Sequence, residues 1–165
     1  DALVHTHTAD ARAFDLGRTF GLVIAPMQTV QLLGGPEGRS RFLQSARRHL
    51  RPGGVLACAI AHDVDVYDRD VQVPLPDLRE VDGVVYQSRP VAIRDDGGAF
   101  VLERLRERVS PDGEHTVTED RIRLDRLTAA ELEREAQAHG LSALARRAIP
   151  ETDDHVGSEV AMLRG

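Results

Sequence analysis

The sequence predicts an α/β domain built on a parallel sheet. Two continuous apolar runs, 20–26 (FGLVIAP) and 55–61 (VLACAIA), have the length and composition of strands buried on both faces. Between them lies a segment whose apolar residues recur at helical spacing. Strand, helix and strand in this order are typical of a βαβ unit, whose crossover is right-handed.

Composition limits the class of protein. A chain of 165 residues with 41% apolar and 29% charged residues is long and apolar enough for one globular domain. Its net charge of −6 disfavours a nucleic-acid partner, because phosphate binding needs a basic surface. No apolar run approaches the ~20 residues of a membrane span, and we expect no membrane partner. Residues 1–20 lack the apolar core of a signal peptide, and Cys58 is the only cysteine, so we expect a cytoplasmic protein.

The elements of the N-terminal third follow from local pattern. Residues 3–8 (LVHTHT) alternate in type and predict a strand, and 9–18 form a loop. A buried strand over 20–25 is closed by Pro26. The segment 27–35 (MQTVQLLGG) predicts a short helical turn that ends at two glycines.

A helix is expected to open at Pro36, where the missing N–H costs nothing. Its apolar face consists of Phe42, Leu43, Ala46 and Leu50. We expect it to stop at 51–54 (RPGG), because proline cannot continue a helix and glycine accepts a left-handed backbone. The second buried strand then covers 55–61.

The middle of the chain changes in character. Residues 62–83 are acidic and rich in turn formers, which indicates a surface excursion. Three antiparallel strands over 84–93, 99–109 and 115–124, joined by hairpins, are predicted next. The second of these also contains good helix formers, but the turn signals on both sides favour a strand.

The best-specified element is a helix near the C-terminus. Thr128 and Glu131 form a capping box at its start, and Gly140 lies at its C-terminal cap. Two strands, 141–149 and 156–163, are expected to follow, with a turn-rich loop between them.

This order of elements resembles the C-terminal two-thirds of the class I S-adenosylmethionine-dependent methyltransferases. Three stretches carry the resemblance: ADARAFDLGRTFGLVIAP (9–26), FLQSARRHLRPGGVLACAI (42–60) and RLTAAELEREAQAHGLSALARRAI (126–149). The most specific motif is LRPGG before a buried strand.

The resemblance implies a Rossmann-like sheet in the order 3-2-1-4-5-7-6 with an antiparallel last strand. Strands three to seven correspond to 3–8, 20–25, 55–61, 141–149 and 156–163. The expected organisation is a single domain over 1–165, with residues 63–125 inserted as an antiparallel three-stranded module that serves as a lid over the substrate.

The sequence departs from the family in one respect. The glycine-rich loop after strand one and the acidic residue after strand two, which hold the cofactor, are absent. Without strands one and two, strand 3–8 has no neighbour for its backbone groups. We therefore expect an N-terminally truncated form of a longer methyltransferase, with open sheet edges that favour association into a homodimer.

The resemblance assigns the cofactor S-adenosylmethionine to two segments. Asp10, Ala11 and Arg12 fall where the family binds adenine; a carboxylate at Asp10 suits the exocyclic amine because it is an acceptor only. A turn-capping Asp10 is the alternative. Ala25, Pro26 and Met27 end a central strand, where ligands bind in open α/β sheets. The sequence APMQ there lacks the motif of methyltransferases that act on nucleic-acid bases.

Four residues are candidates for binding the methyl acceptor or for taking its proton. Gln28, Gln31 and Tyr67 are candidate substrate contacts, although the glutamines also fit exposed positions of a short helix. His62 ends a buried strand and could serve as general base, since its ordinary pKa lies near neutrality. A partly exposed loop histidine is the alternative, and methyl transfer by positioning alone needs no base.

Other signals are weaker. His5 and His7 share a strand face without a third ligand nearby, so we expect no metal. Cys58, mid-strand among apolar residues, should be inert. Arg104, Arg106 and Arg108 alternate along a strand, which fits an anionic substrate or, more commonly, pairing with acidic residues on the neighbouring strand.

The sequence therefore favours an enzyme that transfers a methyl group to an O or N atom of a small-molecule acceptor. Two alternatives stay open. A methyltransferase-like module without activity would act in regulation or dimerisation, and a nicotinamide-dependent oxidoreductase would use a related sheet. The antiparallel final hairpin disfavours the oxidoreductase.

Overall fold

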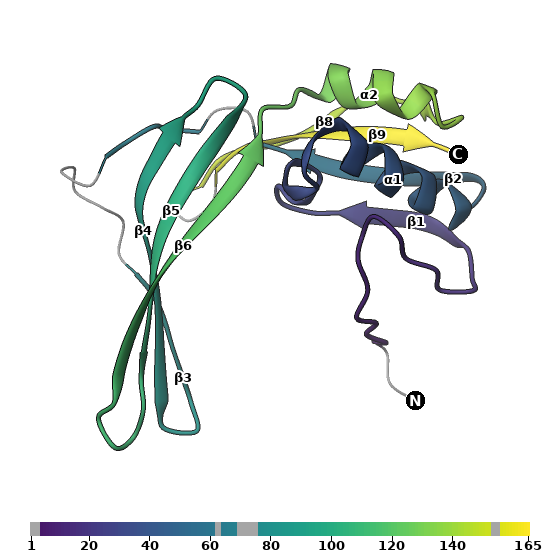
Figure 1. Ribbon diagram of the computed structural model, residues 1–165. Coiled ribbons are helices and arrows are strands. Elements are labelled where there is room, and N and C mark those ends of the chain that lie inside the picture. The colour runs from purple at the N-terminus through teal and green to yellow at the C-terminus, as the bar shows by residue number, and fades with distance from the viewer. Residues whose placement is uncertain (1–3, 62–63, 69–75, 153–155) are drawn as a thin grey trace. The chain divides into compact units, whose positions relative to one another are not determined.

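The chain divides into two compact units in the computed structural model, which describes residues 4–61, 64–68, 76–152 and 156–165. Unit 1 comprises Asp1–Asp63 and Leu127–Gly165. Unit 2 comprises Val64–Arg126 and is built mainly of long strands (Figure 1).

Unit 1 contains a mixed sheet. Its strands are β1 (Phe20–Ala25), β2 (Leu50–Ile60), β7 (Ser142–Ala143), β8 (Arg147–Ile149) and β9 (Ser158–Arg164). They lie in the order β1-β2-β9-β7, with β8 also paired to β9. The pair β1–β2 is parallel, whereas β9 runs antiparallel to its neighbours. The 4-5-7-6 part of the predicted sheet order is thus confirmed.

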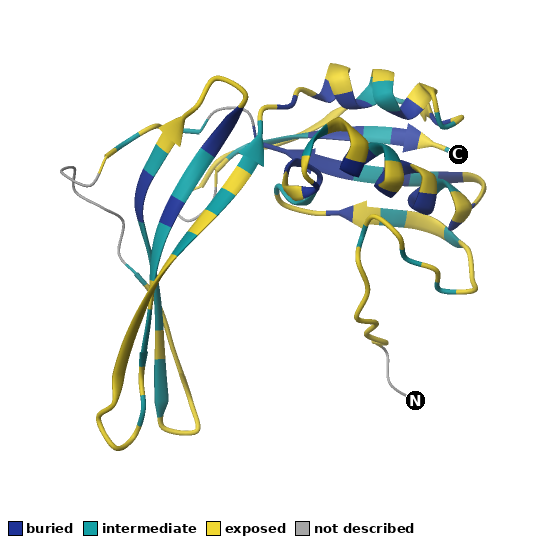
Figure 2. Ribbon diagram, in the orientation of Figure 1, coloured by how far each residue is buried: buried dark blue, intermediate teal, exposed yellow. Residues whose placement is uncertain are grey.

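The helices of unit 1 cover one face of this sheet. The 3₁₀ helix η1 (Thr29–Leu32) follows β1, α1 (Gly35–Arg48) connects to β2, and α2 (Ala129–Gln137) precedes β7. Alternate residues of β2 share a single core cluster with residues of both α1 and α2. Figure 2 shows this buried side of α1 and β2 in dark blue.

The capping box predicted for α2 is present. The Thr128 hydroxyl accepts from the N–H of Glu131 at 3.2 Å, and the Glu131 carboxylate accepts from the N–H of Thr128 at 2.8 Å. This reciprocal pair satisfies two of the donors that a helix start leaves open. A local signal of this kind needs no tertiary partner, which explains why the sequence alone located the helix.

The segment RPGG differs from the prediction. The helix α1 already ends at Arg48, and β2 begins at Leu50, so RPGG is part of the strand rather than a turn before it. The pairing register with β1 shifts here, which marks a bulge. Gly53 has φ 75° and Gly54 lies so close to Phe20 that a Cβ would stand 3.0 Å from its carbonyl oxygen. Both positions therefore require glycine.

The sheet contradicts two further predictions. Residues 4–8 form no strand, and no strand of the described chain runs beside them, in keeping with the lack of a neighbour that the sequence implied. Burial on both faces is also wrong for β1, because the side chains of Leu22 and Ile24 are 52% and 61% exposed. They point to the face opposite α1 and α2, which no helix of the described residues of unit 1 covers.

The predicted strand 141–149 is interrupted. It consists of the short strands β7 and β8 on either side of Leu144–Arg146. Arg146 turns to form ion pairs with Glu133 at 2.7 Å and with Glu159 at 3.3 Å. Both partners are 13 residues away in the sequence, on α2 and β9, so the local pattern could not predict these contacts.

Unit 2 is a four-stranded antiparallel sheet in the order β3-β4-β5-β6. The strands are β3 (Asp77–Val81), β4 (Val84–Asp95), β5 (Ala99–Val109) and β6 (His115–Asp125). The three predicted strands are confirmed, including β5, for which a helix was the alternative. The sequence missed β3, because its alternating charged residues resemble a surface loop.

Candidate functional site

Two parallel strands end side by side in unit 1. Ala25 lies opposite Cys58 in the register, so the residues after β1 and the end of β2 share one edge of the sheet. We call Pro26–Gln31 together with Ala61 the strand-end rim. In open α/β sheets this edge binds ligands, because loops and helix starts diverge there.

Met27 has an unusual backbone at this rim. Its φ is 55°, in the left-handed region that residues with a Cβ seldom adopt, and its side chain is 72% exposed. The preceding carbonyl of Pro26 accepts from the hydroxyl of Thr29 at 2.7 Å, which holds the turn into η1. Strained positions of this kind concentrate at functional sites.

The two candidate glutamines of η1 have different environments. Gln28 is half-buried at the start of η1. Gln31 is only 1% exposed, and its amide bonds both backbone groups of Ala61: Nε2 donates to the carbonyl at 2.9 Å and Oε1 accepts from the N–H at 3.0 Å. These contacts support a structural role for Gln31, in which it fixes the end of β2 against η1.

The predicted adenine contact Asp10 forms a tight turn with Arg12. The carboxylate accepts from the backbone N–H of Arg12 at 2.8 Å and from its guanidinium at 2.8 and 3.0 Å. These bonds lower the pKa of Asp10 to about 2, so the carboxylate is ionised throughout the neutral range. Its side chain is 47% exposed. Arg12 also donates from Nε to the second carboxylate oxygen at 3.1 Å, so Arg12 engages both oxygens while the side chain stays partly open to solvent.

The turn at Asp10–Arg12 lies against the start of α1. Arg12 lines a cavity of about 160 Å³ together with Leu33, Gly34 and Arg41. Ala11 packs against the core cluster that includes Ala25. The structure thus brings the first predicted cofactor segment to the residues that follow η1.

One residue near this segment was missed at the sequence level. His49 is 3% exposed, and its Nε2 lies 2.9 Å from the N–H of Leu16, in the same loop as Asp10. A histidine just after an amphipathic helix carries no local signal of such a contact, because its partner is 33 residues away in sequence.

The structure does not bring the last two predicted site residues to the strand-end rim within its described part. His62 falls outside the described residues. Tyr67 belongs to unit 2, where its N–H donates to the carbonyl of Ile93 at 3.1 Å and its own carbonyl accepts from Ile93 at 2.9 Å. Partial burial raises the pKa of the Tyr67 hydroxyl, and the charge of Arg104 opposes this change.

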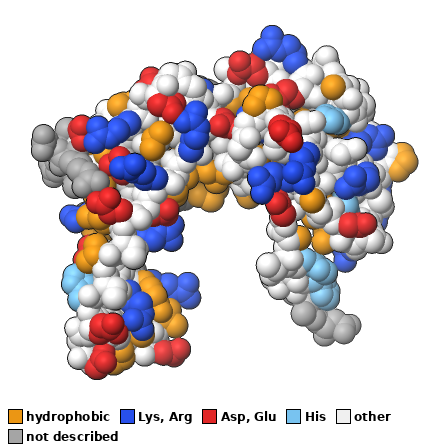
Figure 3. All heavy atoms as spheres, viewed as in Figure 1, with side chains coloured by type: hydrophobic (Ala, Val, Ile, Leu, Met, Phe, Trp, Pro, Cys, Tyr) orange, Lys and Arg blue, Asp and Glu red, His pale blue; other side chains and the backbone are white. Residues whose placement is uncertain are grey.

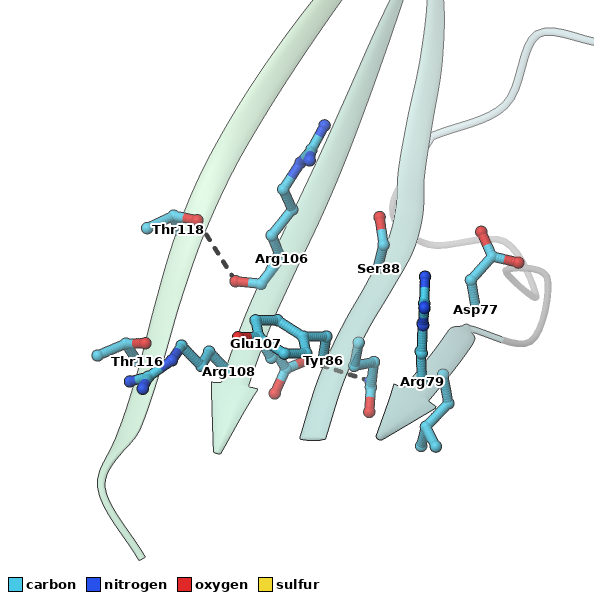
Figure 4. Close-up of a pocket in the computed structure, with 11 residues that line it drawn as sticks. Asp77, Arg79, Tyr86, Ser88, Arg106, Glu107, Arg108, Thr116 and Thr118 are labelled. Carbon is cyan, nitrogen blue, oxygen red and sulfur yellow. Dashed lines mark hydrogen bonds between the residues drawn. The ribbon is translucent and has the colours of Figure 1, made fainter. Parts of the chain in front are cut away.

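Unit 2 has a hollow on one face of its sheet. The cavity measures about 450 Å³ and spans all four strands. The register places Arg79, Tyr86 and Arg108 side by side in one row across β3, β4 and β5 (Figure 4). The aliphatic stems of such arginines contribute apolar surface to a groove while their charged ends reach solvent.

The arginines of β5 pair with acidic residues on neighbouring segments. The pairs are Arg104–Asp77 at 3.2 Å, Arg106–Asp120 at 2.7 Å and Arg108–Glu114 at 4.0 Å. Acidic and basic side chains are interspersed over the visible face of the molecule (Figure 3). This pattern supports cross-strand ion pairing rather than a dedicated anion site.

The remaining sequence signals yield no site in the described part of the chain. His5 and His7 are exposed, and no group of three or more potential metal ligands occurs among the described residues. Cys58 is fully buried, and burial raises the pKa of its thiol to about 12. None of the helices described is long and apolar enough to cross a membrane.

Comparison with known proteins identifies the fold. No protein-family model and no curated protein matches the sequence. Among solved structures, DesVI from Streptomyces venezuelae is 24% identical with a TM-score of 0.68, over 94% of this chain and 63% of its own. The sugar N-methyltransferase KedS8 from a Streptoalloteichus species is 20% identical with a TM-score of 0.65, over 94% and 60%.

A third match has its ligand in place. CalS10, an amino pentose methyltransferase from Micromonospora echinaspora in calicheamicin biosynthesis, was solved with S-adenosylmethionine bound; it is 22% identical with a TM-score of 0.60, over 93% of this chain and 62% of its own. The chain therefore spans less than two thirds of these structures. At such identities the similarity establishes the fold, which is that of the class I S-adenosylmethionine-dependent methyltransferases.

Proposed function

We propose that this chain takes part in methyl transfer from S-adenosylmethionine to an N or O atom of a small molecule, with the amino group of a sugar as the favoured acceptor. The observation that carries the proposal is the sheet order β1-β2-β9-β7 with the antiparallel β9 inside it. CalS10 is an amino pentose methyltransferase and KedS8 is a sugar N-methyltransferase, which favours the amino group of a sugar over an alcohol as the acceptor.

The residues present fit two parts of the cofactor. The exposed, ionised carboxylate of Asp10 suits the adenine amino group, and the adjacent Ala11 and Arg12 complete this segment. Ala25, the last residue of β1, and Pro26 and Met27 of the strand-end rim suit the methionine part. The glycine-rich loop and ribose-binding acid of the family have no counterpart in the printed sequence.

The bound cofactor supplies a methyl group on a positively charged sulfur. An acceptor N or O atom would take this methyl group, with S-adenosylhomocysteine as the leaving group, and the acceptor would give up one proton. Orientation of the acceptor dominates such an in-line displacement. His62, which follows Ala61 in the sequence, is our candidate for taking this proton.

Three further assignments rest on the resemblance alone. They are the role of Gln28 as an acceptor contact, that of Tyr67, and the lid function of residues 63–125. A homodimer is proposed on another ground, the open sheet edges that the missing strands would leave. For Gln31, the bonds to Ala61 favour a structural role over contact with the acceptor.

Ligand-induced thermal stabilisation tests the cofactor assignment. The complete natural polypeptide that carries these 165 residues should be stabilised by S-adenosylhomocysteine and not by NADH. Asp10→Ala should weaken S-adenosylhomocysteine binding about tenfold, since one charge-assisted hydrogen bond is lost, whereas Asp10→Asn keeps an acceptor oxygen and should weaken it less.

Other results of the thermal-stabilisation experiment would support one of the two alternative functions. Stabilisation by NADH alone would indicate an oxidoreductase. The absence of stabilisation by either ligand would indicate a module without activity and would contradict the proposal. An unchanged affinity in Asp10→Ala would remove Asp10 from the adenine site.

A further inference from the structure

His49 connects three parts of unit 1. It is the residue directly after α1, and its Nδ1 lies 2.7 Å from the carbonyl oxygen of Ser45, one turn earlier. Its own carbonyl accepts from the N–H of Phe20 at 2.7 Å, which ties it to the start of β1. The ring of Phe14 packs against its imidazole at a centroid distance of 4.6 Å.

The two ring nitrogens of His49 have fixed roles. A carbonyl oxygen only accepts, so Nδ1 must carry the proton that it donates to Ser45. Nε2 then holds a lone pair, and it accepts from the N–H of Leu16 at 2.9 Å. The neutral imidazole in one tautomer satisfies both bonds, inside a position that is 3% exposed. The carboxylate of Asp15, in the same loop, lies farther from Nε2, at 3.6 Å.

A second side chain of α1 reaches the same loop. Ser45 is 1% exposed, and its hydroxyl lies 3.4 Å from the carbonyl oxygen of Arg12. Ser45 and His49 stand four residues apart, on one face of the helix end. The loop that contains Asp10 is therefore held from α1 at both Arg12 and Leu16.

We propose that His49 is a positioning residue for the cofactor: by fixing Leu16 it holds the Asp10–Arg12 turn in the geometry that receives adenine. This inference rests on the proposed function. Loops that are ordered before binding give tighter complexes, because the entropy of ordering them is lost on folding and not on binding.

Two isosteric variants separate this role from general stability. In His49→Gln the side-chain oxygen reaches the place of Nε2 and accepts from Leu16. In His49→Asn the amide reaches only the place of Nδ1, so it serves Ser45 and leaves Leu16 without its acceptor. Both variants remove the imidazole, so both lose the same packing contact with the Phe14 ring.

The measurements use the complete natural polypeptide. We expect His49→Asn to raise the dissociation constant of S-adenosylhomocysteine about tenfold and to accelerate amide exchange of Leu16, the effect of one lost hydrogen bond. His49→Gln should restore most of the affinity. In turnover, the KM for S-adenosylmethionine should rise while the KM for the acceptor stays unchanged.

Two controls keep the test decisive. His139, whose Nε2 bonds the hydroxyl of Ser40 at 2.9 Å, is another histidine of the α1–α2 packing, and His139→Asn should leave the affinity unchanged. If His49→Asn does not fold, Ser45→Ala tests the same loop through Arg12, with a rise of about threefold expected for a longer, weaker bond.

The results distinguish a failure of the positioning role of His49 from a failure of the proposed function. Equal affinities in the wild type and His49→Asn, or unchanged exchange at Leu16, would overturn the positioning role and leave the proposed function intact. If only Ser45→Ala folds, an unchanged affinity there would overturn the positioning role in the same way. A wild type that does not bind S-adenosylhomocysteine would instead reject the proposed function, and the positioning role with it.

Discussion

The amide of Gln31 bonds both backbone groups of Ala61, one as donor at 2.9 Å and one as acceptor at 3.0 Å. It thereby substitutes for a neighbouring strand at the last residue before His62. The end of β2 is held by a side chain from η1, and this geometry leads to the first prediction.

Replacing Gln31 by Leu should lower the free energy of unfolding by about 2–4 kcal/mol, because the buried N–H and C=O of Ala61 both lose their partner. Urea denaturation measures the change. Gln28→Leu, a change of the same type in the same turn, should stay within about 0.5 kcal/mol. Equal losses in the two variants would contradict the assigned role of Gln31.

The ion pair between α1 and α2 should be strongly coupled. Arg39, whose side chain is 6% exposed, makes two hydrogen bonds to Glu135 at 2.7 and 2.8 Å. Glu135→Ala should cost about 3 kcal/mol, because it removes the carboxylate that the buried Arg39 guanidinium contacts through two bonds, and the apolar double variant Arg39→Met/Glu135→Leu should recover most of it. A double-mutant cycle in urea measures the coupling, and purely additive losses would contradict it.

The capping box predicts a dependence of stability on pH. Hydrogen bonds from the backbone and side chain of Thr128 lower the pKa of Glu131 from its ordinary 4.5. A carboxyl group with a lowered folded-state pKa stabilises the protein above pH 4.5, and this contribution is lost as the pH falls through the folded value.

Thr128→Ala should cost about 1 kcal/mol at pH 7, since it removes the N-cap acceptor. Glu131→Gln should flatten the fall in stability below pH 4.5. Thermal unfolding at a series of pH values compares the variants. An unchanged pH profile in Glu131→Gln would show that other carboxylates dominate acid unfolding.

The arginines of β5 should behave as surface ion pairs. The side chains of Arg106 and Asp120 are 56% and 36% exposed. Arg106→Ala should therefore cost less than about 1 kcal/mol and leave the KM of the acceptor unchanged. A rise of the KM that is specific to an anionic acceptor would instead support the alternative of an anion site on this strand.

The thiol of Cys58 should be unreactive in the folded protein. Burial raises its pKa to about 12, so very little thiolate exists at pH 8. Titration with a thiol reagent should show no reaction in buffer and one thiol in urea. Fast reaction of the native protein would mean that β2 opens readily.

The sequence predicted elements whose determinants are local. The capping box located α2, and the turn at Asp95–Gly98, where Gly97 donates to the Asp95 carboxylate at 2.8 Å, marked the hairpin between β4 and β5. Errors arose where a neighbour decides. Residues 4–8 alternate like a strand but have no strand beside them in the described chain, and Arg146 interrupts 141–149 through partners elsewhere.

The candidate site shows the same division. The strand-end rim followed from the βαβ pattern, because parallel strands must end at one edge. The bonds of Gln31 to Ala61 and of His49 to Leu16 join residues about thirty positions apart, and no periodicity in the sequence records them.

Unit 2 lies between β2 and α2 in the sequence. In the sheet of unit 1, β2 nevertheless pairs directly with β9. The entropy of closing the intervening loop grows only with the logarithm of its length. Exchange of this segment for a longer or shorter one therefore costs the sheet little. The pairing of β2 with β9, and the strand-end rim after β1, would then keep their geometry whichever segment takes the place of Val64–Arg126.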